Sequence, residues 1–109
     1  MANTYKVLAQ TKPTANTESD SYTVPASTST VVSSIVITNV GESPAFYSIV
    51  VAPAGAATTD AMYIAKEIGI PSRDAIALTL GLTLATTDKI RVLSSTGFVN
   101  FNIFGSEIA

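Results

Sequence analysis

The chain has 109 residues and a formal net charge of −2; only 13% of it is Asp, Glu, Lys or Arg, and it contains no His, Cys or Trp. Soluble domains carry about 25% charged residues, so much of this surface must consist of Ser, Thr, Ala and aliphatic side chains. The missing residue types exclude disulfides, thiolate nucleophiles and histidine bases or ligands. The six basic residues are scattered along the sequence, so we expect no nucleic-acid partner.

The first predicted element is a short N-terminal strand or arm within about residues 1–12. It pairs either with the chain's own sheet or with the exposed edge of a neighbouring copy, since strand addition is a common way to join subunits. Tyr5, Val7 and Leu8 are therefore the candidate interface residues. The first residues lack the basic and apolar regions of a signal peptide, and no apolar run reaches the length of a membrane span.

A polar loop over residues 11–20 leads to a second predicted strand at 21–25. The next run, 30–39, places Val31, Ile35 and Ile37 on one face of an ideal strand and Val32 and Val36 on the other. This pattern predicts a strand that is buried on both faces, and residues 46–52 have the same character. One apolar face of each of these two strands would pack in the core, and we expect the other face to be covered either by other subunits or by a loop of the same chain.

Residues 60–69 fit two structures equally well. Ala61, Ile64, Ala65 and Ile68 have helical spacing, with Asp60 as a possible N-cap. Alternation over the same residues fits a strand.

The remaining runs predict further strands. Residues 75–80 alternate most cleanly, with Ile76, Leu78 and Leu80 on one face, and the pattern resumes after Gly81. Strands are also expected at 89–93 and 98–104, and the turns recur at intervals of about 8–14 residues. The whole chain, 1–109, is therefore expected to form one all-β domain, an antiparallel β-sandwich or jelly roll of about seven or eight strands.

Any catalysis would depend on carboxylates, which are Asp20, Asp60, Asp74, Asp88, Glu18, Glu42, Glu67 and Glu107. Each Asp lies in or beside a predicted turn, where its usual role is to bond the local backbone. The sequence has no phosphate-binding glycine loop and no calcium-binding loop. We therefore expect no catalytic residues, no metal or cofactor, and no enzymatic activity.

Several segments resemble small virion structural proteins of tailed bacteriophages, including phages of cyanobacteria. The matching segments are YKVL at 5–8, YTVP at 22–25, STVVSSI at 29–35, YIA at 63–65, LTLGLTL at 78–84, TDKIRV at 87–92 and FNIFGSE at 101–107. The resemblance covers nearly the whole chain, and its motifs concern architecture, not a site. It implies a β-sandwich, and it implies a strand in the region of Tyr63.

The resemblance and the low charge together lead to one functional expectation. The chain would be a virion protein that forms a homotrimer and decorates or cements the head by contact with the major capsid protein. The alternatives are a tail, neck or baseplate accessory protein, and a carbohydrate-binding module for host adhesion. None of these roles requires a membrane or nucleic acid.

Overall fold

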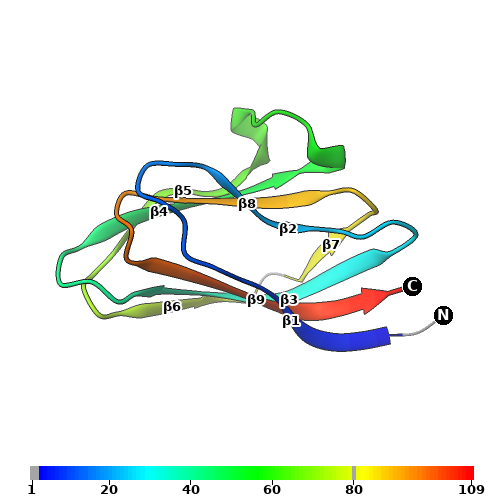
Figure 1. Ribbon diagram of the computed structural model, residues 1–109, viewed down its shortest axis with the longest axis horizontal. Coiled ribbons are helices and arrows are strands. Elements are labelled where there is room, and N and C mark those ends of the chain that lie inside the picture. Colours follow the sequence, from blue (N-terminus) through cyan, green and yellow to red (C-terminus); the bar gives the residue numbers. More distant parts are fainter. Residues whose placement is uncertain (1–2, 80) are drawn as a thin grey trace.

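The computed structural model describes residues 3–79 and 81–109, which form two antiparallel sheets packed as a sandwich (Figure 1). The five-stranded sheet has the order β1 (Asn3–Thr11), β9 (Val99–Ile108), β3 (Ser29–Asn39) and β6 (Ala75–Leu78), with β7 (Leu82–Leu84) also paired to β3. The four-stranded sheet has the order β2 (Ser19–Thr23), β8 (Lys89–Ser94), β4 (Ala45–Ala52) and β5 (Tyr63–Ile70). The predicted all-β sandwich is confirmed.

The strand order is that of a jelly roll. The chain alternates between the two sheets at every connection except β4 to β5 and β6 to β7. The described residues form nine strands, not seven or eight, because the run after Ala75 is divided into β6 and β7 around Gly81, whose φ is +61°. Both pieces pair with β3, so together they take the place of one jelly-roll strand. Leu80, predicted to share a face with Ile76 and Leu78, lies outside the described residues.

The core lies between the two sheets and is almost entirely aliphatic. Its largest fully buried side chain, Phe101, meets the Tyr47 ring edge to face, with the ring centroids 6.3 Å apart. The other buried members of the core are Tyr22, Val24, Val32, Ile35, Ile37, Ala45, Ile49, Ile70, Leu84, Ile90, Val92, Val99 and Ile103. The core therefore draws on both sheets, as the alternating pattern of the strands requires.

The prediction that 30–39 is buried on both faces is wrong, because β3 contains a bulge. The register against β9 shifts between Val32 and Ser34, and the extra residue reverses the alternation. Val32, Ile35 and Ile37 consequently all face the core, while Val31 and Val36 are only partly buried on the outside. Gly105 lies opposite the bulge, where a Cβ atom would stand 2.1 Å from the Val31 carbonyl oxygen.

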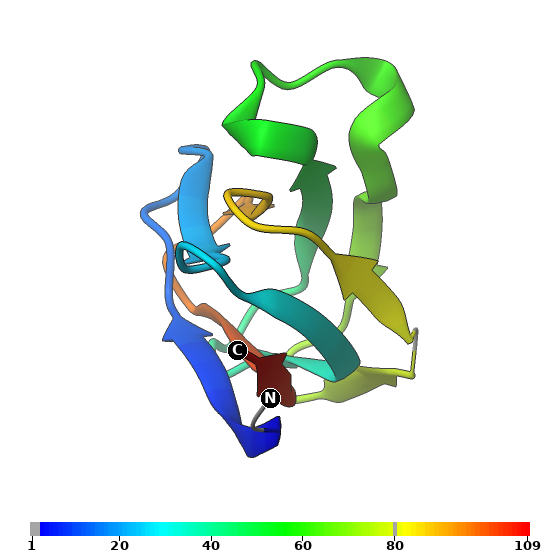
Figure 2. The same ribbon diagram turned by 90° about the vertical axis from the view of Figure 1, so that its right-hand side faces the viewer.

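The apolar outer face of β4 is covered at one end only. Val50 is buried but lies outside the central core, and residues 53–62 form a loop over this end of the sheet (Figure 2). The loop contains two 3-10 turns, Pro53–Gly55 and Asp60–Met62. At the other end Phe46 remains 56% exposed. The explanation by a covering loop therefore holds for Val50 and fails for Phe46.

Residues 60–69 begin with a single 3-10 turn, Asp60–Met62, and continue as the edge strand β5. The helical alternative is wrong beyond that first turn, because the backbone pairs with β4 instead. Glu67 has a φ of +51°, which lies outside the right-handed helical region. The strand implied for the Tyr63 region is present.

The N-terminal strand pairs with its own chain, along β9. Of the two predicted pairings, this is the one with the chain's own sheet. The register of β1 shifts between Val7 and Ala9, opposite the same part of β9 at which β3 bulges. Within the described residues, no helix has the length and apolar character needed to cross a bilayer.

Candidate functional site

Most of the carboxylates are engaged in holding the fold. Asp74 accepts a hydrogen bond from the Ala75 backbone, and Asp88 accepts bonds from Ala85 and Ala54. The other occupied pairs are Glu18 with Thr58, Asp20 with Lys89 and Arg91, Glu42 with Arg73, Asp60 with Lys66, and Glu107 with Lys6 and Tyr22. Among the residues that the structure describes, only the Glu67 carboxylate has no hydrogen bond or ion pair.

The carboxylates do not gather into a metal site. In residues 3–79 and 81–109 there is no group of three or more acidic side chains placed to hold an ion. The predicted backbone-bonding role holds for Asp74 and Asp88. Asp20 differs, because it lies within β2 and receives Lys89 Nζ at 2.8 Å and Arg91 Nε at 3.0 Å. These bonds, led by Lys89, hold the pKa of Asp20 below its usual value.

A polar cluster joins the two sheets near the chain ends. The Tyr22 hydroxyl bonds to Thr30 Oγ1 at 2.8 Å and donates to the Glu107 carboxylate, which also binds Lys6 Nζ at 2.8 Å. Burial, with Glu107 beside it, raises the pKa of Tyr22 to about 12. The Lys6 and Tyr22 bonds lower the pKa of Glu107. The cluster connects β1, β2, β3 and β9, and its hydrogen bonds and ion pair hold the two sheets together at this end.

Arg91 fixes the loop that covers one end of the four-stranded sheet. Its guanidinium donates to the carbonyl oxygens of Gly55 and Ala56 and to Thr58 Oγ1, at 2.6–3.0 Å. Because Arg91 also forms an ion pair with Asp20 of β2, the same guanidinium group holds both the loop and β2. This arrangement closes the outer face over Val50 and leaves the Phe46 end open.

Among the described residues, the strands of the five-stranded sheet turn no charged side chain to their outer face; Lys12, which follows β1, borders this face at one end, where it lines a depression with Gln10, Asn100 and Asn102. Register and burial place the following side chains outward: Tyr5, Val7 and Gln10 of β1; Asn100, Asn102, Phe104 and Ser106 of β9; Val31, Ser34, Val36 and Thr38 of β3; Ala75 and Ala77 of β6; and Thr83 of β7. We call this set the uncharged face. Lys6 and Glu107 belong to the same strands but turn inward to the Tyr22 cluster.

The three predicted interface residues separate into two groups. Tyr5, which is 80% exposed, and Val7, which is 48% exposed, lie on the uncharged face. Leu8 is the extra residue of the β1 bulge and packs partly buried against the core. A partner can therefore reach the first two side chains directly, while Leu8 mainly fills space inside the sandwich.

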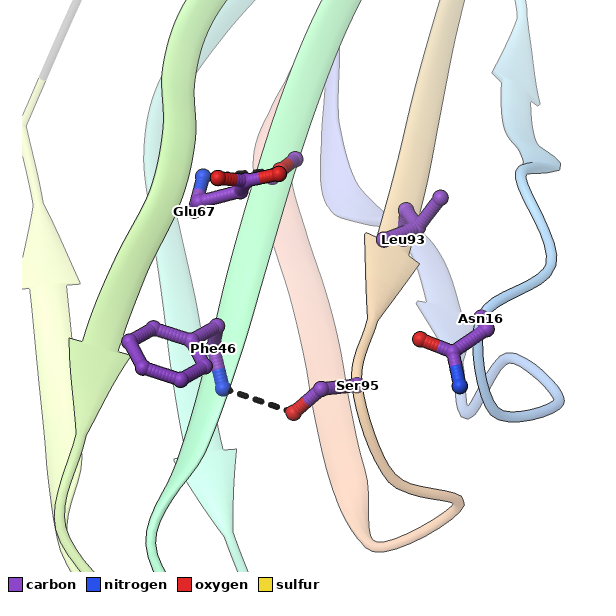
Figure 3. A pocket seen from close by; sticks show the side chains of 6 residues that line it. Asn16, Phe46, Glu67, Leu93 and Ser95 are labelled. Carbon is purple, nitrogen blue, oxygen red and sulfur yellow. Dashed lines mark hydrogen bonds between the residues drawn. The ribbon is translucent and has the colours of Figure 1, made fainter.

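A shallow depression of about 200 Å³ lies on the opposite broad face, on the outside of the four-stranded sheet (Figure 3). Its lining residues are Asn16, Phe46, Ser48, Glu67, Leu93 and Ser95. Ser95 Oγ accepts the Phe46 N–H and Ser48 Oγ accepts the Glu67 N–H, both at 2.9 Å. Each hydroxyl therefore keeps its own proton free to donate.

No pattern in the sequence indicates this depression. Its residues come from four separate segments, and the β5 bulge that aligns Glu67 with Ser48 depends on pairing with β4. In the sequence, Phe46 opens a predicted strand and Glu67 is one of eight carboxylates. No protein-family model matches this chain, and no curated protein matches it.

Proposed function

We propose that this chain is a non-enzymatic structural protein of a tailed-phage virion, which forms a homotrimer and decorates or cements the head. The observation that carries the proposal is the uncharged face. Soluble monomers normally spread charged groups over their whole surface, whereas here the charged strand residues lie at the rim or on the other sheet. A surface of this kind suits burial against further protein.

Copies of the same chain are the partners that this face fits best. Two charged faces of one sign repel when identical copies meet, whereas an uncharged face carries no such penalty. The molecule measures 45 × 27 × 19 Å, and its two sheets are stacked along the 27 Å direction (Figure 1), so the uncharged face of about 45 × 19 Å is comparable to the roughly 800 Å² that each partner gives to a standard interface. Three copies can turn this face toward a common axis, with Tyr5 and Val7 at one end of it.

Cementing a head requires no chemistry from any single copy. Burial of apolar surface stabilises a complex by about 25 cal/mol per Å² before the entropic cost of association is subtracted. Many symmetric copies of such a contact add up over a shell that holds a packaged genome under pressure. The jelly roll suits this role, since viral capsid domains use the same architecture, although a shared fold alone does not determine function.

The deciding experiment is cryo-electron microscopy of intact particles that contain this protein. The proposal expects trimers on the head at hundreds of copies per particle. A few dozen copies or fewer at the neck, tail or baseplate would replace the head assignment with the accessory role. Sedimentation of the purified protein is the companion measurement, and a strict monomer at high micromolar concentration would count against the trimer.

A further inference from the structure

The depression beside Phe46 combines an apolar platform with polar groups that have spare hydrogen-bonding capacity. The Phe46 ring is 56% exposed, and one of its edges lies over Gly69, where an added Cβ would stand 3.9 Å from the ring. Figure 3 shows Phe46 and Glu67 on one side of the depression and Leu93 and Asn16 on the other. Ring faces and short aliphatic side chains suit the C–H surface of a small ring.

The polar groups of the depression have hydrogen-bonding capacity that the fold leaves unused. Within the described residues, neither the Glu67 carboxylate nor the Asn16 side-chain amide makes a hydrogen bond. The Ser48 and Ser95 hydroxyls have accepted one bond each and can still donate. The depression thus offers two amide donors, two hydroxyl donors and several acceptor oxygens around one apolar platform, which is the balance found in small-molecule sites.

The backbone is irregular at two of the lining residues. Asn16 has a φ of +56° and Glu67 a φ of +51°, although side chains other than glycine rarely adopt the left-handed region. Asn tolerates it well, but for Glu it costs free energy. At Glu67 the strain accompanies a bulge, and the Ser48 hydroxyl replaces the missing ladder bond. Bulges that redirect a side chain are over-represented next to functional sites.

Size and charge narrow the class of ligand. A volume of about 200 Å³ is smaller than the pockets that hold drug-sized molecules, so one small ring fills it. Glu67 is the one ionisable side chain in the lining, and a carboxylate repels carboxylate and phosphate groups. We propose that this depression binds one neutral pyranose ring of a glycan, stacked on Phe46 and hydrogen-bonded by Glu67 and Asn16.

This proposal is independent of assembly through the uncharged face, because the two surfaces belong to different sheets. A protein that packs by the five-stranded sheet keeps the four-stranded sheet turned outward, where a glycan can reach it. Failure of sugar binding would leave the assembly proposal unchanged.

The test is a titration of isotope-labelled protein with the methyl glycosides of glucose, galactose, mannose and N-acetylglucosamine, followed by NMR. At least one of them should shift the amide signals of Asn16, Phe46 and Ser95, with a dissociation constant on the order of 1–10 mM for a ligand of this size. Phe46→Ala should weaken binding about tenfold. Glu67→Gln, which keeps the shape and removes the charge, should weaken it several-fold.

Phe98→Ala is the matched control, because Phe98 is also 56% exposed and does not line the depression; it should bind like the unaltered protein. The proposal is overturned if none of the four glycosides shifts these signals. It is also overturned if Phe46→Ala and Phe98→Ala weaken binding equally, or if a sialylated sugar binds more tightly than the neutral ones.

Discussion

Two acidic residues illustrate opposite uses of a carboxylate in this molecule. Glu107 is largely buried, bonded to Lys6 and Tyr22, and stabilises the contact between the sheets. Glu67 is exposed, lies on a strained bulge and contributes no bond from its carboxylate within the described residues. The first is expected to matter for stability and its dependence on pH, and the second for binding at the cost of some stability.

Acid should destabilise the fold partly through Glu107. Its pKa is lowered from 4.5 in the folded protein, so its contribution is present above that value and is lost as the pH falls through the folded pKa. Urea unfolding at a series of pH values should show a flatter acid limb for Glu107→Gln. Tyr22→Phe removes the hydroxyl partner of Thr30 and one of the two partners of Glu107, which keeps Lys6, and it should cost about 1–2 kcal/mol at neutral pH. An unchanged acid limb would remove Glu107 from this role.

Glycine at position 67 should make the protein more stable. The left-handed backbone of Glu67 costs about 1–2 kcal/mol, whereas glycine adopts it freely at an entropic cost of about 0.5–1 kcal/mol. Glu67→Gly should therefore raise the free energy of unfolding by about 0.5–1 kcal/mol and weaken sugar binding. The control is Lys66→Gly, which lacks the strain and should lower stability. Thermal unfolding of both variants checks the sign, and a less stable Glu67→Gly protein would contradict the argument.

Bulges determine which side chains of the strands face the core. β1 and β3 both bulge opposite the same part of β9, and the extra residues, Leu8 and Ser33, reset the alternation on either side. Without the β3 bulge, Val32 and Ile35 could not both point inward. Gly105 of β9 makes this arrangement possible, because the β3 backbone passes where a side chain would start.

Alanine at position 105 should therefore be severely destabilising. The added Cβ would collide with backbone, not with a side chain that could move aside, so β3 or β9 must shift. We expect Gly105→Ala to lose at least about 3 kcal/mol of unfolding free energy or to fail to fold. Gly97→Ala meets no atom within 4 Å and should change stability by less than about 1 kcal/mol. Chemical denaturation of both proteins makes the comparison.

The outer faces of the two sheets differ in charge and in surface shape. Among the described residues, the strands of the five-stranded sheet turn no charged side chain outward, and Lys12 borders this face at one end. The outside of the four-stranded sheet carries Asp20, Lys89, Arg91 and Glu67, together with the covering loop and the depression. This asymmetry leads to the pairing of roles proposed above, in which one face packs in an assembly and the other faces outward.

A charge introduced on one face or the other should show which of the two faces forms the contact between copies. Asn102 lies near the centre of the uncharged face, between Gln10 and Val36 on the neighbouring strands. Asn102→Asp keeps the shape and adds a charge that an interface would have to desolvate. It should weaken self-association at least tenfold in sedimentation experiments, while Asn16→Asp on the opposite sheet should not. Equal self-association of both variants would place the contact elsewhere.

The sequence alone was enough to predict an all-β sandwich, most of its strands and the structural use of Asp74 and Asp88. These features depend on alternation and turn chemistry, which are properties of neighbouring residues. The periodicity of the sequence could not decide between helix and strand for β5, and it could not predict the inward turn of both Val32 and Ile35 or the depression at Phe46. Each of these depends on a bulge or on pairing between distant segments, and the free energy of such contacts exists only when the strands meet.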